Sequence, residues 1–245
     1  MNLFQKSTFV LKWGSKLKIE FLEKFPIYVR MKLYEEIYRI NQLLSESKNS
    51  EIIHIPNLNI FSTESFFSNK EKWDLLRKFL IRIGNPNFTL GGNLYLGKEQ
   101  KIESLGNLKS LSGSLILNDS DLKSFGYLEK IGGNVNIRNS EIKSLDNIQT
   151  IGGDLEIHKQ EIKSLGNLEY VGLDLFISDC TLNSLNNLES VGGNCIIHNS
   201  DLKNVGKLKT VGGQLVISST TIYKNRKLKE KILSQVDARN GIFFS

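Results

Sequence analysis

The residues of this sequence with the most versatile side-chain chemistry are three histidines and two cysteines, His54, His158, His198, Cys180 and Cys195. Histidine and cysteine bind transition metals, and either can act as a general base or a nucleophile when a partner group lies within hydrogen-bonding reach. Whether these five residues can do so depends on the elements that hold them. Those elements follow from a repeat that runs through more than half of the chain.

Residues 113–212 consist of five consecutive blocks of 20 residues that share one pattern. The blocks read GSLILNDSDLKSFGYLEKIG, GNVNIRNSEIKSLDNIQTIG, GDLEIHKQEIKSLGNLEYVG, LDLFISDCTLNSLNNLESVG and GNCIIHNSDLKNVGKLKTVG. A further block with one extra residue occupies 92–112, and half a block occupies 213–222. A fixed short period is typical of a solenoid, in which each coil packs only against its neighbours. We number the residues of each block from position 1 to position 20.

Apolar residues occupy fixed positions in each block. Positions 3 and 5, as in Val135 and Ile137, alternate with polar residues, which predicts a short strand with both side chains in the core. Positions 10, 13, 16 and 19 are also apolar, and their spacing favours a 3₁₀ or polyproline-like return path over an α-helix. Position 8 carries small polar groups that can satisfy buried backbone groups. Glycine pairs such as Gly132 and Gly133 predict sharp turns.

On this pattern the histidines and cysteines form no reactive site. His158 and His198 share position 6 two coils apart, ~10 Å at the strand spacing of a sheet, which is too far for one metal ion. Cys180 at position 8 and Cys195 at position 3 are expected in the core, and they lack Cys-x-x-Cys spacing. No Ser/His/Asp group converges, and no glycine-rich run leads from a strand into a helix. We expect no enzyme activity, no metal and no cofactor.

The segment 155–162 reads LEIHKQEI and fits the pattern L-x-L-x-x-N-x-L, with Gln at the Asn position. On these residues the chain resembles the leucine-rich repeat family. With phrases such as SLGNLEYVG it is also similar to short repeats of uncharacterised bacterial and bacteriophage proteins and to receptor L-domain-like solenoids. The resemblance covers residues 90–222. It implies a right-handed, curved solenoid whose parallel sheet binds ligands, usually proteins, on its concave face, and it implies no chemistry.

The expected fold class is α+β, a right-handed leucine-rich-repeat solenoid with a parallel β-sheet. The solenoid is expected over 91–222, with a mainly helical N-terminal domain or cap at 1–90 and a capping helix and tail at 223–245. Helical spacing of apolar residues predicts helices at 28–44, 70–83 and 223–236, and the segment 52–61 is predicted to be extended. Residues 1–90 are either a cap for the first coil or a separate helical domain.

Position 4, the outward residue of the strand, is apolar on three consecutive coils, at Phe176, Ile196 and Val216. A contiguous exposed apolar patch usually marks a contact surface, so we predict that a protein partner binds here. Two alternatives to a partner are open. β-Branched and aromatic residues suit strands in general, so the three residues could have no binding role, or the apolar tail at 242–244 could fold over them. The flanking residues assigned to the same surface are Arg138, Glu156, His158 and His198.

Charge is unevenly distributed along the chain, which has a net charge of +6. Residues 1–90 carry +5, residues 91–222 carry −3 and residues 223–245 carry +4. A basic helix at 223–236 can bind phosphate backbones or acidic membranes, although such charge is more often a solvated outer face. In successive coils, acidic residues at position 9 and lysines at position 11 form two neighbouring columns of charge. We interpret these columns as a solvated face.

The sequence has no secretion signal and no run of about 20 apolar residues, and two cysteines do not make a disulfide framework. We therefore expect a cytoplasmic protein. The predicted function is that of a non-catalytic protein-binding module that uses the exposed sheet face of its solenoid. The alternatives are a nucleic-acid or membrane-surface adaptor that acts through the basic terminal helices, and a structural or assembly component of a phage-like particle.

Overall fold

The computed structural model describes residues 52–55, 69–82, 84–98 and 101–245. The chain divides into two compact units, Met1–Pro86 and Asn87–Ser245. In the first unit the described elements are β1 (Ile52–Ile55) and α4 (Asn69–Arg82), and α4 buries Trp73, Leu76 and Leu80. The helix expected at 28–44 lies outside the described residues.

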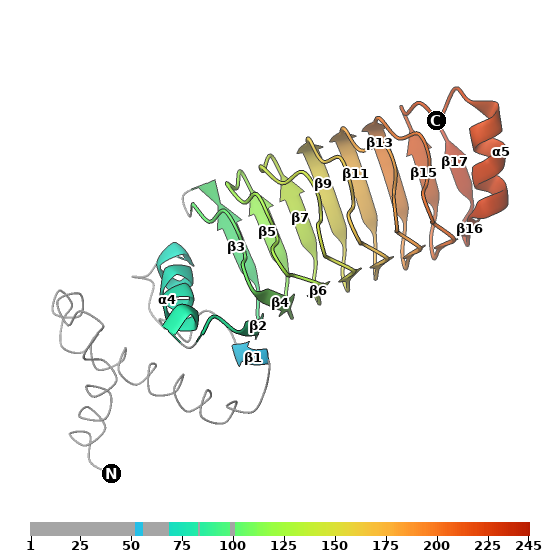
Figure 1. Ribbon diagram of the computed structural model, residues 1–245. Helices are drawn as coiled ribbons and strands as arrows, with labels where there is room; N and C mark the ends of the chain where they lie inside the picture. The colour runs from blue at the N-terminus through green and yellow to red at the C-terminus, as the bar shows by residue number, and fades with distance from the viewer. Residues whose placement is uncertain (1–51, 56–68, 83, 99–100) are drawn as a thin grey trace, which may run out of the picture. The chain divides into compact units, whose positions relative to one another are not determined.

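The second unit is a parallel β-solenoid in which the coils contribute strands to two ladders (Figure 1). Partners in the ladders are 20 residues apart over most of the solenoid, as for Leu155, Leu175 and Cys195. The first ladder contains β3 (Leu94–Gly97), β5 (Leu115–Asn118), β7 (Val135–Arg138), β9 (Leu155–Gln160), β11 (Leu175–Cys180), β13 (Cys195–Ser200), β15 (Leu215–Ser218) and β17 (Ile242–Phe244).

The second ladder lies on the return path, for which the sequence predicted a 3₁₀ or polyproline-like conformation. It contains β2 (Asn87–Leu90), β4 (Leu108–Leu111), β6 (Lys130–Ile131), β8 (Thr150–Ile151), β10 (Tyr170–Val171), β12 (Ser190–Val191), β14 (Thr210–Val211) and β16 (Asp237–Ala238). Six of these strands cover two residues each, which is too short for an alternating pattern to show in the sequence. Isolated parallel bridges also join position 12 of neighbouring coils, for example Ser144 and Ser164.

The core runs along the inside of the solenoid and is built from the predicted apolar positions. In the block 133–152 all six inward side chains are fully buried. These are Val135, Ile137, Ile142, Leu145, Ile148 and Ile151. The prediction for positions 3, 5, 10, 13, 16 and 19 is confirmed. Because each coil covers only its neighbours, the buried rows of one coil continue into the next.

Position 2 carries a row of polar side chains that links the coils. Each side chain accepts a hydrogen bond from the backbone N–H at position 2 of the next coil: Asp174 Oδ1 accepts from Asn194 at 2.6 Å, and Asn194 Oδ1 accepts from Gln214 at 3.0 Å. The same bond recurs along the preceding coils, on Asn93, Ser114, Asn134 and Asp154. This row supplies acceptors for N–H groups at the corner that leads into each strand of the first ladder.

Position 20 is glycine in each of the five full blocks because neighbouring backbones approach closely there. A Cβ atom added to Gly192 would lie 2.0 Å from the carbonyl oxygen of Gly172, and one added to Gly212 would lie 2.0 Å from that of Gly192. Such contacts are far inside van der Waals distance. The glycines of the turns are therefore also required by the packing of one coil on the next.

Helix α5 (Arg226–Gln235) follows the last half block. Asn225 caps it, with its Oδ1 accepting the Leu228 N–H at 3.2 Å, and Ile232 is buried. The Gln235 side-chain amide donates to the carbonyl oxygens of Gly206 at 2.9 Å and Leu208 at 3.0 Å. After α5, strands β16 and β17 add one more member to each ladder, and Figure 1 shows α5 beside them.

Candidate protein-binding face

The outward side chains at position 4 of the first ladder form one row in strict register. Phe176 pairs with Ile196, Ile196 with Val216, and Val216 with Phe243 of β17. We call these four residues the apolar row. The strand neighbours of Phe176, Leu175 and Ile177, are fully buried, so alternation along the strand places the row on the opposite face from the core.

The apolar row is partly accessible to solvent. Phe176, Ile196 and Val216 are half-buried by their neighbours in the row, and the terminal Phe243 is 48% exposed. The sequence left open that the tail at 242–244 covers this surface. The tail instead pairs with β15 as the next strand of the ladder, so Phe243 lengthens the row by one aromatic residue. Within the second unit, the tail does not fold over the outer face of the row.

A polar cluster borders the row on the side of the earlier coils. The Asn136 amide donates to Glu156 Oε2 at 2.7 Å, and the same oxygen lies 4.0 Å from His158 Nε2. His158 Nδ1 lies 2.8 Å from Ser178 Oγ, and the His158 ring packs against the Phe176 ring with 4.9 Å between centroids. The end of the apolar row is therefore held in place by a hydrogen-bonded neighbour.

The sequence pattern predicted that no Ser/His/Asp group converges, but the structure brings Ser178, His158 and Glu156 together as a serine–histidine–carboxylate grouping. It arises because positions 4 and 6 of adjacent coils face the same side of the sheet. Ser178 is only 7% exposed, and the separation of 4.0 Å between Glu156 Oε2 and His158 Nε2 is too long for a hydrogen bond that would orient the imidazole. These features fit a structural pair better than an activated nucleophile.

A second histidine–serine pair supports the structural interpretation. His198 Nδ1 lies 2.8 Å from Ser218 Oγ, with the same geometry two coils further on, and its strand carries Ile196 where the first pair has a carboxylate. His198 is exposed, as is Arg138, whose register partner is His158. The predicted surface residues therefore lie on one face, in two adjacent columns at positions 4 and 6.

The two cysteines lie inside the solenoid. Burial raises the pKa of Cys195 to about 12 and the pKa of Cys180 to about 11, so both thiols stay protonated at neutral pH. Cys180 Sγ also lies 3.0 Å from the Ser178 carbonyl oxygen, to which it donates. Thiol chemistry at either residue would require the coil to open.

Position 8 satisfies buried backbone groups in some coils. The Gln160 amide donates to the carbonyl oxygens of Ser140 at 2.7 Å and Ile142 at 2.6 Å, as the sequence predicts for this position. Among the described residues, the buried hydroxyls of Ser200 and Thr220 have no hydrogen-bond partner. The predicted role therefore holds for Gln160 and does not hold for these two hydroxyls.

The charged columns at positions 9 and 11 form surface ion pairs. Lys143 Nζ lies 2.7 Å from Glu161 Oε2, and this hydrogen bond and the charge of Lys143 hold the pKa of Glu161 below its usual value. Both side chains are exposed, and ion pairs of this kind contribute about 0–1 kcal/mol. The pairing fits the predicted solvated face.

The fold and these contacts define the class of protein, a parallel β-solenoid repeat protein with a partly exposed apolar row on its first ladder. No protein-family model, no curated protein and no solved structure matches the chain. Across the described parts of the chain, no three His, Cys, Asp or Glu side chains are grouped to hold a metal ion. Among those same residues, no helix combines the length and apolar character that crossing a bilayer requires.

Proposed function

We propose that this protein is a non-catalytic binding module whose apolar row, with its polar border, contacts a protein partner. The observation that supports this most directly is the register of Phe176, Ile196, Val216 and Phe243 on four consecutive strands. Apolar side chains at the centre of a contact, surrounded by polar and charged groups, are the usual composition of a protein interface. Arg138, Glu156, His158 and His198 supply that polar border.

The rigidity of the surface also supports the proposal. The row stands on a continuous ladder, and Phe176 is held by the His158 ring at 4.9 Å between centroids. A surface that is already ordered loses little conformational entropy when a partner binds. The row therefore needs no rearrangement to present its side chains.

The test is affinity capture from the native host with the variant Phe176→Asp/Ile196→Asp. We expect the variant to fold normally and to lose the captured partner, because two buried carboxylates in the interface would lack counter-charges. The matched control is Ile116→Asp, which changes the same repeat position on β5 and should retain the partner. Equal capture by the double variant and the wild type would refute this surface.

The same proposal includes three more specific assignments, which concern the type of repeat, the C-terminal cap and the cellular location. The repeats are a short, glycine-rich form of the leucine-rich repeat, α5 with β16 and β17 caps the C-terminal end, and the protein acts in the cytoplasm. The fit of residues 155–162 to the leucine-rich pattern supports the first assignment, and the two hydrogen bonds of Gln235 to the preceding coils support the second.

A second candidate function is a nucleic-acid adaptor that uses α5. Lys224, Lys227 and Lys231 are exposed and form no ion pair with any described carboxylate, since the Glu230 side chain pairs with Arg226. Binding to duplex DNA that weakens steeply with salt, and that acidic vesicles do not reproduce, would favour this function. An assembly role in a phage-like particle would instead appear as ordered self-association that Phe176→Asp abolishes.

A further inference from the structure

Two neighbouring hydroxyl groups inside the solenoid have no protein partner. Ser200 and Thr220 occupy position 8 of consecutive coils and are 7% and 8% exposed. Neither hydroxyl oxygen has a hydrogen-bond partner among the described residues. A buried hydroxyl without a hydrogen bond has lost its hydration without compensation, so native proteins almost always provide a protein group or an ordered water molecule.

The other side chains at position 8 do find partners. The Ser120 hydroxyl accepts the Leu122 N–H at 3.2 Å, and the Cys180 thiol donates to the Ser178 carbonyl oxygen at 3.0 Å. The Gln160 amide makes several hydrogen bonds to the preceding coil. Within the described part of this column, the unpartnered hydroxyls are therefore confined to its last two members.

The register of the coils brings these two hydroxyls to the spacing of neighbouring strands. His198 pairs with Ser218 two residues earlier, and Asn199 and Ser219 at position 7 have similar left-handed φ angles of 46° and 50°. The chain therefore enters position 8 in the same way in both coils. Equivalent atoms of adjacent strands are ~4.8 Å apart. Two oxygens at that separation cannot bond directly, but one water molecule joins them with two bonds of about 2.8 Å.

Gln160 shows which groups serve this place between two earlier coils. Its Oε1 accepts the Ser140 N–H at 2.9 Å, and its Nε2 donates to the carbonyl oxygens of Ser140 at 2.7 Å and Ile142 at 2.6 Å. Thr220 stands in the same relation to Ser200, but its shorter side chain reaches no acceptor. A water molecule has donors and an acceptor like the amide, and the Ser200 carbonyl oxygen is its third partner.

The surroundings of the two hydroxyls favour a neutral ligand. The neighbouring inward side chains of the same two coils are apolar and fully buried, namely Ile197, Leu202, Ile217 and Ile222. None of the charged side chains described in residues 87–245 is buried, so an ion at this place would lack a counter-charge. A buried site with two or three polar partners is the kind that holds water in proteins.

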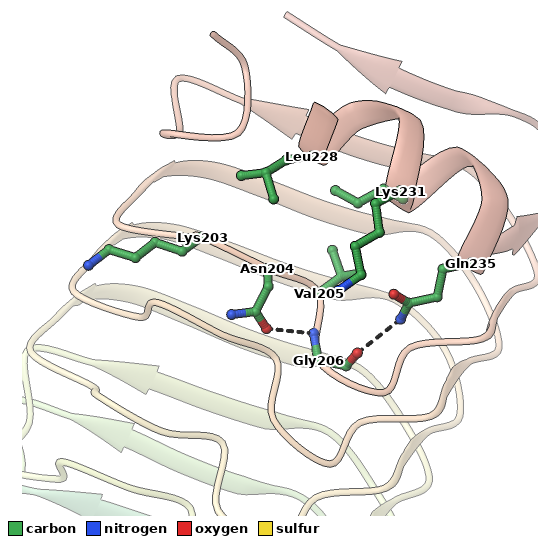
Figure 2. Close-up of a pocket in the computed structure, with 8 residues that line it drawn as sticks. Lys203, Asn204, Val205, Gly206, Leu228, Lys231 and Gln235 are labelled. Atoms are coloured by element: carbon green, nitrogen blue, oxygen red, sulfur yellow. Dashed lines mark hydrogen bonds between the residues drawn. The ribbon is translucent and has the colours of Figure 1, made fainter. Parts of the chain in front are cut away.

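Helix α5 packs on the coil that carries Ser200 (Figure 2). Positions 12 and 13 of this coil are Asn204 and Val205, where the four preceding full blocks have Ser and then Leu or Phe. Val205 and Ile232 of α5 line a small pocket, and the Gln235 amide donates to the Gly206 carbonyl oxygen at 2.9 Å. Because α5 covers this part of the coil, a water molecule inside it should exchange slowly with bulk water.

We propose that Ser200 and Thr220 bind one ordered water molecule that links the block 193–212 to the half block 213–222. The water accepts a hydrogen bond from one hydroxyl and donates one to the other, and its second hydrogen bonds to the Ser200 carbonyl oxygen. It takes the place of the Gln160 amide as the link between coils. This site lies inside the solenoid and does not depend on the function proposed for the apolar row.

The first test counts slowly exchanging water molecules in the full chain by ¹⁷O magnetic relaxation dispersion. The variant Ser200→Ala/Thr220→Val removes both hydroxyls, and we expect one long-lived water fewer than in the wild type, since a small apolar site stays dry. Ser120→Ala is the matched control, because Ser120 has the same repeat position, is 3% exposed and has its own partner. The same count in the wild type and the double variant would overturn the proposal.

A double-mutant cycle separates one shared water from two independent hydroxyls. Ser200→Ala and Thr220→Val should each raise the unfolding equilibrium constant roughly tenfold, because each leaves the water and the other hydroxyl short of a partner. The double variant should raise it no more than either single change, since no polar group then needs the water. Ser120→Ala combined with Thr220→Val should multiply the two single effects. Multiplied effects for Ser200→Ala with Thr220→Val, measured by urea denaturation, would contradict a shared water.

A crystal structure of the wild-type chain provides a test that needs no variant. We expect density for one water oxygen within hydrogen-bonding distance of both hydroxyl oxygens and of the Ser200 carbonyl oxygen. A direct bond between the two hydroxyls, or hydroxyls that bond to protein carbonyls alone, would overturn the proposal.

Discussion

Phe243, the third residue counted from the end of the sequence, is the register partner of Val216 in a parallel ladder. The chain passes through α5 between these residues and returns to the same sheet. The C-terminal strand therefore covers the edge of β15 and extends the apolar row on the outer face. These two roles can be separated experimentally.

Deletion of residues 242–245 should destabilise the protein, because the fully buried Leu215 and Ile217 would lose the strand that lies beside them. We expect the free energy of unfolding to fall by about 2–4 kcal/mol, which is the cost of exposing one or two large apolar side chains to water. The measurement is urea denaturation followed by circular dichroism. Phe243→Ser is the control, and it should change stability by less than about 1 kcal/mol because its side chain points outward. Equal effects of the two changes would contradict the separation of roles.

The polar row at position 2 should contribute to stability through its hydrogen bonds. Asp174→Ala removes the acceptor of the Asn194 N–H at 2.6 Å, and we expect a loss of about 1 kcal/mol. Asp174→Asn keeps an acceptor oxygen in the same place and should restore most of the stability. Thermal unfolding of the three proteins at one pH distinguishes them. If the alanine and asparagine variants lost the same amount of stability, the hydrogen bond from the Asn194 N–H to Asp174 would not be the cause of the loss.

Close packing of the coils should make position 20 intolerant of a methyl group. Gly192→Ala would bring a Cβ atom to 2.0 Å from the Gly172 carbonyl oxygen, and the two coils would have to separate locally. We expect a cost of about 1–3 kcal/mol, typical of overpacking. Gly97→Ala is the matched comparison, since its Cβ atom would make an ordinary contact at 3.4 Å. Chemical denaturation that found Gly192→Ala as stable as the wild type would contradict the observed packing.

The raised pKa values of the cysteines predict a loss of stability in alkaline solution. Burial raises the pKa of Cys195 from 9.0 to about 12, so above pH 9 the unfolded chain releases a proton that the folded chain retains. The unfolded state then binds fewer protons, and the free energy of unfolding falls as pH rises from 9 toward 12. Cys195→Ala should show a shallower fall over this range than the wild type. An identical slope in both proteins would rule out the buried thiol as a contributor.

The sequence predicted the inward positions of the coil well because burial of apolar side chains repeats with the period. The row of Leu155, Leu175 and Leu215, with Cys195 between the last two, needs only a 20-residue spacing to be recognised. The second ladder was missed, since a two-residue strand such as β8 leaves no alternation to detect. Hydrogen-bonded neighbours on different coils, such as Asp174 and Asn194, were missed because only the stacked structure places their atoms together.

Part of the candidate surface was also predictable. Phe176, Ile196 and Val216 were found because they share a repeat position, whereas Phe243 follows a helix and has no repeat to mark it. The pocket beside α5 combines a break in the pattern at Asn204 with a helix whose docking the sequence does not specify. A departure from the repeat at two adjacent positions was the available signal.

The most direct test of the proposed function is site-specific photo-crosslinking at the apolar row. A benzophenone amino acid replaces Ile196 in one protein and Thr150, on the second ladder, in another. After irradiation in a lysate of the native host, we predict a discrete adduct from position 196 with one partner and none with that partner from position 150. Adducts of the same partner from both positions, or from position 150 alone, would contradict the account.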